Sequence, residues 1–126
     1  MDAKQEYIII ITEFINKTSA GNLQWKKQNP STLYIETVAG GNEPAVISIQ
    51  KIQERRRERV EDRVRTTNVE YYVFSVKKPL SKELVIQIDS SSDKSYHGIL
   101  SELFQVADYK IEKRSIDFLR GIMDNL

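Results

Sequence analysis

The chain has 126 residues, 40% of them hydrophobic and 29% charged, which is the composition of one globular domain and not of a disordered segment. Lys and Arg total 19 against 18 Asp and Glu, and the net charge of +1 excludes whole-protein attraction to nucleic acid or anionic lipid, so such binding requires a local patch. The absence of Cys and the presence of a single His exclude disulfides, cysteine nucleophiles and His-rich or thiolate metal sites.

Residues 2–18 predict a helix, because apolar side chains and one threonine fall at helical spacing, at Tyr7, Ile11, Phe14, Ile15 and Thr18. Four consecutive isoleucines at 8–11 favour a strand instead. We prefer the helix because Gly21 follows where a left-handed residue ends helices. The apolar run at 7–11 is too short for a secretory signal or a membrane span, so we expect a soluble, cytoplasmic protein without membrane association.

Strand-like runs follow along the middle of the chain, at 23–25, 32–38, 45–52, 69–77 and 83–88. The strongest turn cluster, 39–44, separates two of these runs and predicts a hairpin connection. Consecutive strands joined by short turns pair in antiparallel fashion, so the pattern predicts a meander.

After a polar loop at 89–95, helical periodicity returns in two stretches that form either two helices or one bent helix. We expect their apolar faces to be buried at Leu100, Leu103, Phe104, Ala107, Leu119 and Ile122. The predicted fold class is α+β: an antiparallel four- to five-stranded meander covered by N-terminal and C-terminal helices. One domain spans 1–126, with an Arg/Glu-rich protrusion at about 53–68.

The order of these landmarks resembles a family of small, uncharacterised bacterial and prophage proteins. The resemblance is carried by an N-terminal helix, the Leu23-Gln24-Trp25 step, a strand meander, and a closing helix with Leu100, Leu103, Phe104 and Ala107 followed by an amphipathic stretch. It implies a fold and no activity. This chain departs from the family pattern between 52 and 69, where it carries the Arg/Glu-rich segment.

Residues 54–65 hold six of the eight arginines together with four acids. As a helix, the segment would neutralise itself through ion pairs between neighbouring turns. As a hairpin with its turn near Val60, it would present arginines on one face, at Arg55, Arg57, Arg59, Arg63 and Arg65. The segment is then either a solvated protrusion or an arm that binds an anion or a partner.

Trp25 is expected as a core anchor, with a stacking platform for a base as the alternative, and Tyr71 is a candidate ligand contact. His97 reads as a surface residue. No phosphate-binding glycine loop, nucleophile elbow or metal motif is present, so we predict neither an enzyme nor a cofactor.

The function predicted from these observations is a non-enzymatic interaction module of a bacterial or phage accessory system that self-associates. The alternative is a phage-type binder that sequesters a nucleotide signal through its Arg-rich arms. Because four acids interleaved along the segment repel a continuous phosphate backbone, a small phosphate-bearing ligand is favoured over extended nucleic acid. The expected partners are therefore a second copy of the chain, a protein, or a small phosphate-bearing ligand.

Overall fold

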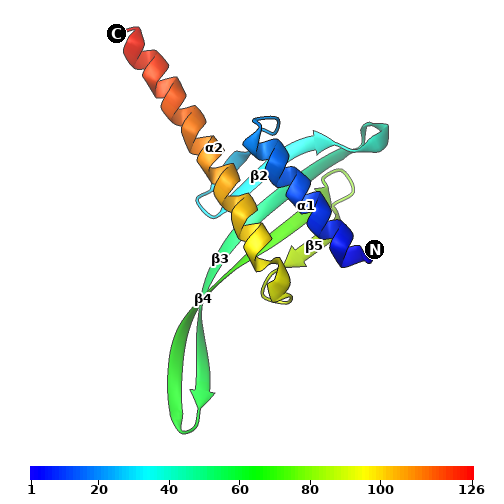
Figure 1. Cartoon of the computed structure of the whole chain (residues 1–126), viewed down its shortest axis with the longest axis vertical. Coiled ribbons are helices and arrows are strands. Elements are labelled where there is room, and N and C mark those ends of the chain that lie inside the picture. The colour runs from blue at the N-terminus through cyan, green and yellow to red at the C-terminus, as the bar shows by residue number, and fades with distance from the viewer.

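The computed structural model describes all of residues 1–126 and has two helices that flank five strands in chain order (Figure 1). Their bounds are α1 Ala3–Ser19, β1 Lys26–Asn29, β2 Thr32–Val38, β3 Pro44–Val60, β4 Arg63–Lys78, β5 Glu83–Asp89 and α2 His97–Asp124. The strands form one antiparallel sheet in the order β1-β2-β3-β4-β5. The α+β meander predicted from the sequence is confirmed.

Helix α1 forms despite its isoleucine run because both of its ends are capped. The Asp2 side chain accepts a hydrogen bond from the Gln5 backbone N–H at 2.9 Å, and the Gln5 side chain accepts from the Asp2 N–H at 3.2 Å. At the other end Gly21 adopts φ +80°, and Asn22 N–H donates to the Lys17 carbonyl at 2.9 Å. This is the Schellman arrangement that glycine permits.

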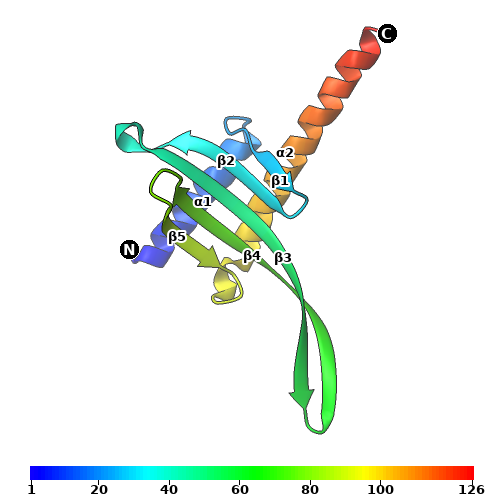
Figure 2. The ribbon, with the colours of Figure 1, turned by 180° about the vertical axis from the view of Figure 1, so that it is seen from behind.

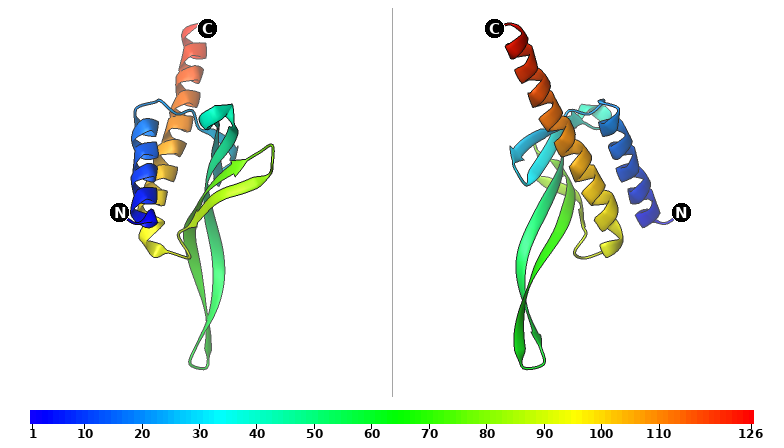
Figure 3. Two further views of the ribbon diagram at one scale, coloured as in Figure 1. Left: turned by 90° about the vertical axis from the view of Figure 1, so that its right-hand side faces the viewer. Right: turned by 60° about the vertical axis from the view of Figure 1, so that its left-hand side comes forward.

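Both helices pack on one face of the sheet and against each other, so the second face stays open (Figure 2 and Figure 3). Alternate strand residues supply the covered face because side chains alternate along a strand. Leu33, Ile49 and Phe74 lie at its centre and are buried. Ile11 and Ile15 of α1 and Leu100, Leu103, Phe104 and Ala107 of α2 pack onto it.

Trp25 is a core residue, with 1% of its surface exposed. Its indole N–H donates to the Thr18 hydroxyl at 2.9 Å, and Thr18 in turn donates to the Phe14 carbonyl at 2.7 Å. The ring is enclosed, so the alternative of a stacking platform for a base is wrong. Arg114 of α2 donates to the Trp25 carbonyl, which fixes the helix over this corner of the core.

The C-terminal helical stretches form one continuous helix, α2, which at 1.5 Å per residue is about 42 Å long. This length exceeds what the sheet can cover, and the helix runs past the sheet edge (Figure 1). Residues 112–126 are all exposed. The prediction that Leu119 and Ile122 are buried is therefore wrong: 59% and 43% of their surfaces are exposed.

Candidate functional site

The Arg-rich segment is a hairpin, not a helix. Strand β2 pairs with β3 only as far as Gln50, and β5 pairs with β4 only from Val73 onward. Between these limits, residues 52–60 pair solely with residues 63–71. We call residues 52–71 the arm; nine residues per strand make it about 27 Å long, and it projects from the sheet on the side away from the C-terminal end of α2 (Figure 1).

A two-residue turn at Glu61 and Asp62 closes the arm, with Val60 paired to Arg63. Glu61 adopts φ +59°, the left-handed conformation that tight hairpin turns require. The turn lies where the hairpin interpretation of the sequence had put it, next to Val60.

The register of the arm divides its arginines between two faces. Directly paired residues of an antiparallel ladder point to the same side, as do residues two apart on one strand. Arg55, Arg57 and Arg59 pair with Asn68, Thr66 and Val64. These six residues form what we call the Arg55 face.

The opposite side, the Arg56 face, contains Arg63 and Arg65 together with Arg56, Glu54 and Glu58. The prediction that all five candidate arginines share one face is therefore wrong. The cause is the two-residue turn: it pairs each odd-numbered position of β3 with an even-numbered position of β4, so Arg63 and Arg65 rotate away from Arg55, Arg57 and Arg59.

Charge is distributed unequally between these faces. The Arg55 side of the arm carries three arginines and one acid, Glu70 at its base, whereas the Arg56 face carries three arginines and two glutamates. Glu61 and Asp62 occupy the turn itself. Arg55, Arg57 and Arg59 are exposed and make no ion pair within the chain, because the one ion pair of the arm's arginines joins Arg56 to Glu54 at 3.4 Å.

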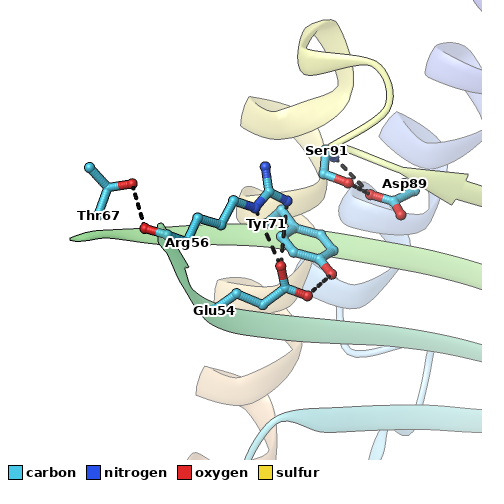
Figure 4. Close-up of polar contacts among 6 residues, drawn as sticks. All are labelled: Glu54, Arg56, Thr67, Tyr71, Asp89 and Ser91. Carbon is cyan, nitrogen blue, oxygen red and sulfur yellow. Dashed lines mark hydrogen bonds and ion pairs between the residues drawn. The ribbon is translucent and has the colours of Figure 1, made fainter. Parts of the chain in front are cut away.

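Tyr71 anchors the base of the Arg56 face (Figure 4). Its hydroxyl donates to Glu54 at 2.7 Å, and the Arg56 guanidinium lies 5.9 Å from its ring centre. The hydrogen bond to Glu54 raises the pKa of Tyr71. Glu54 thus occupies the hydroxyl of Tyr71 and Arg56 lies near its ring, although neither was selected as a site residue from the sequence. Tyr71 pairs with Ile52, so Glu54 and Arg56 lie two and four residues further along the same face of the hairpin, and only the hairpin register identifies them.

At the base of the Arg55 face, Glu70 is held by its own chain. It accepts hydrogen bonds from Gln53 at 3.1 Å and from the Tyr72 hydroxyl at 3.1 Å, and Lys51 Nζ lies 3.6 Å away. The hydrogen bond from Gln53, with those from Tyr72 and Lys51, lowers the pKa of Glu70. The nearest acid on this side of the ladder is therefore already satisfied.

A second uncovered surface lies on residues 115–126, the last turns of α2 and the two residues that follow it, which we call the α2 tail. The last contacts that hold α2 to the sheet are Lys27 with Asp108 at 3.0 Å and Glu112 at 2.7 Å, and Arg114 with the Trp25 carbonyl. Hydrogen bonds and ion pairs to Glu112 and Asp108 raise the pKa of Lys27. Beyond them the helix leaves the sheet.

The α2 tail is amphipathic although nothing covers it. Its large apolar side chains are exposed by 43–92%, at Ile116, Phe118, Leu119, Ile122, Met123 and Leu126. Ile116, Leu119 and Met123 follow one another in α2 at intervals of three and four residues, which is the spacing of a coiled-coil seam, and Leu126 continues this spacing just beyond the end of the helix at Asp124. Asp117, Gly121 and Asp124 lie on the opposite side of the helix.

Other chemistry is sparse. No group of three or more His, Asp or Glu side chains is arranged to hold a metal ion, and no helix is long and apolar enough to cross a membrane. His97 is exposed, with its Nδ1 3.4 Å from the Ser90 hydroxyl.

Comparison of the chain with protein families, with curated proteins and with solved structures finds no match. The arrangement of the arm and the α2 tail is therefore the basis for assigning a function.

Proposed function

We propose that the protein is a non-enzymatic interaction module that self-associates through the α2 tail. The observation that carries this proposal is the exposed seam formed by Ile116, Leu119, Met123 and Leu126. A monomer that displays such a stripe leaves apolar surface in water that association can bury.

A second copy of the chain fits this surface because an a/d seam is a self-complementary shape. Two such helices bury their stripes against each other around a two-fold axis, with each knob in a hole of the partner. The α2 tail extends beyond the sheet and α1, so these elements do not block a helix of a second subunit from packing along it (Figure 3). The polar side, with Asp117 and Asp124, then remains in solvent.

The alternative, a binder that sequesters a small phosphate-bearing ligand, has weaker support. A depression of about 500 Å³ lies at the base of the arm, but Glu54 and Glu70 line it beside Arg55. Small ligands bind in concave sites, and neither Arg57 nor Arg59 contributes to this one. A screen of nucleotides by thermal shift tests this alternative, because tight binding raises the melting temperature.

Self-association is tested by light scattering at high micromolar concentration on the wild type, Leu119→Glu and Gly121→Glu. We expect a wild-type dimer or higher oligomer, a monomeric Leu119→Glu variant and an unchanged Gly121→Glu variant. Gly121 is a matched control because an added side chain meets nothing within 4 Å and lies opposite the seam. A monomeric wild type, or equal behaviour of the two variants, would refute the proposal.

A further inference from the structure

We infer that the Arg55 face of the arm binds the phosphate backbone of B-form duplex DNA. This surface is distinct from the α2 tail, and the inference does not depend on self-association. It rests on three properties of the arm: the placement of its charges, the freedom of its arginines, and its shape.

The first property is segregation of charge. Interleaved acids in the sequence argue against a continuous phosphate backbone, but the register moves them off this face. Glu54 and Glu58 point to the Arg56 face, and Glu61 and Asp62 lie at the turn. The residues opposite Arg55, Arg57 and Arg59 are Asn68, Thr66 and Val64, and the one acid on this side is Glu70 at the base of the arm. Thr and Asn side chains donate hydrogen bonds to phosphate oxygens.

The second property is that these arginines are available. Arg55, Arg57 and Arg59 are exposed and have no carboxylate partner, so no internal ion pair has to break before they meet an anion. Glu70, the nearest acid at the base of this side, is held by Gln53, Lys51 and Tyr72. Guanidinium groups hydrogen-bond to phosphate in bidentate geometry, and these charge-assisted bonds are about twice as strong as neutral ones.

The third property is shape. An isolated two-stranded ribbon has the width that the major groove of B-form DNA admits. The three arginines span about 13 Å of the ribbon, a length over which duplex DNA carries about eight phosphates. Double-stranded RNA is a poorer fit because its major groove is deep and narrow. The arm projects from the sheet (Figure 1), and Arg57 and Arg59 do not line the depression at its base, so the three arginines form a row along a strand. A row favours an extended polyanion over a single nucleotide.

The test is fluorescence anisotropy of a labelled DNA duplex of about 20 base pairs, titrated with the full chain. We expect a dissociation constant on the order of 10 μM at 50 mM salt. Three phosphate contacts predict a slope of about −2.7 in log affinity against log salt, or a loss of about 40-fold between 50 and 200 mM. A triple variant, Arg55→Gln, Arg57→Gln and Arg59→Gln, should lose binding and most of this slope.

The matched control replaces the three arginines of the Arg56 face: Arg56→Gln, Arg63→Gln and Arg65→Gln. It removes the same charge from the same arm, so a purely long-range attraction would weaken both variants equally. We expect the control to retain binding within about fivefold of the wild type. Circular dichroism and thermal unfolding verify that both variants keep the fold, since all six side chains are exposed.

Three results would overturn the inference: no binding of duplex DNA by the wild type at 50 mM salt, equal losses in the two triple variants, or tighter binding of a polyglutamate peptide or an RNA duplex than of DNA. The peptide result would assign the Arg55 face to an acidic protein partner. Each comparison uses samples whose oligomeric state has been measured, so failure of self-association and failure of DNA binding remain distinguishable.

Discussion

The first half of α2 lies against the sheet and α1, whereas its second half continues past the sheet edge into solvent (Figure 3). Both halves carry apolar side chains at helical spacing. Leu103 has none of its surface exposed, and Leu119 has 59%. An apolar stripe therefore predicts which side of a helix tends to be buried. It does not predict whether the burying surface belongs to the same chain.

The sharpest test of this comparison is truncation of one leucine in each half. Leu103→Ala should lower the free energy of unfolding by about 2–5 kcal/mol because it opens a cavity in a closed core. Leu119→Ala should change it by less than about 0.5 kcal/mol, since the site is already solvated. Urea denaturation at the lowest practical protein concentration measures both. Equal losses would show that the two halves are not distinct.

A smaller loss of stability is expected when the buried hydrogen bond between the Trp25 indole and Thr18 is removed. Thr18→Val keeps the shape of the side chain but removes the acceptor for Trp25 Nε1, and should cost about 1–3 kcal/mol. Thr12→Val is the control, because Thr12 makes the same bond to the carbonyl four residues back at 2.7 Å but is exposed. A neutral Thr18→Val variant would mean that the Trp25 hydrogen bond contributes nothing to stability.

The smallest effect is on the pH dependence of stability and comes from Glu70 at the base of the arm. Glu70 has a pKa below its usual 4.5 in the folded state, chiefly through the hydrogen bond from Gln53. A depressed pKa adds stability above the unfolded-state pKa, and this stability is lost as the pH falls through the folded-state value. Glu70→Gln should therefore flatten the stability profile below about pH 4.5. Thermal unfolding between pH 3 and 7 measures it, and an unchanged profile contradicts the assignment.

The fold was predictable from the sequence wherever local chemistry is decisive. Gly21 marks the end of α1, and the 39–44 cluster marks a hairpin. The two faces of the arm were not predictable, because they depend on whether the turn has an even or odd number of residues. A change of one residue there reverses the side on which Arg63 and Arg65 lie.

The exposure of the α2 tail was missed for a related reason. Periodicity gives the direction of a side chain, while its burial depends on what lies opposite in three dimensions. For Leu119 nothing lies opposite. Trp25, which was expected in the core, does have groups opposite it: Thr18 at its indole N–H and Arg114 of α2 at its carbonyl. The sequence left two helices or one bent helix open, so the length of α2 was not fixed in advance. As one helix of 28 residues, α2 extends beyond the seven-residue strands β2 and β5.

The packing of α1 against α2 has a consequence for synthesis of the chain. Each strand of the meander pairs with the one made just before it, so the sheet can assemble as it is made. The apolar faces of α1 and the sheet stay partly uncovered until α2 is made, because α2 follows all five strands in the chain. At 5–20 residues per second, synthesis of the chain between α1 and the first half of α2 takes on the order of ten seconds. During this time Ile11 and Ile15 lack the helix α2 that packs beside them in the core. The nascent chain is therefore most exposed to aggregation in the interval between completion of β5 and release of the first turns of α2.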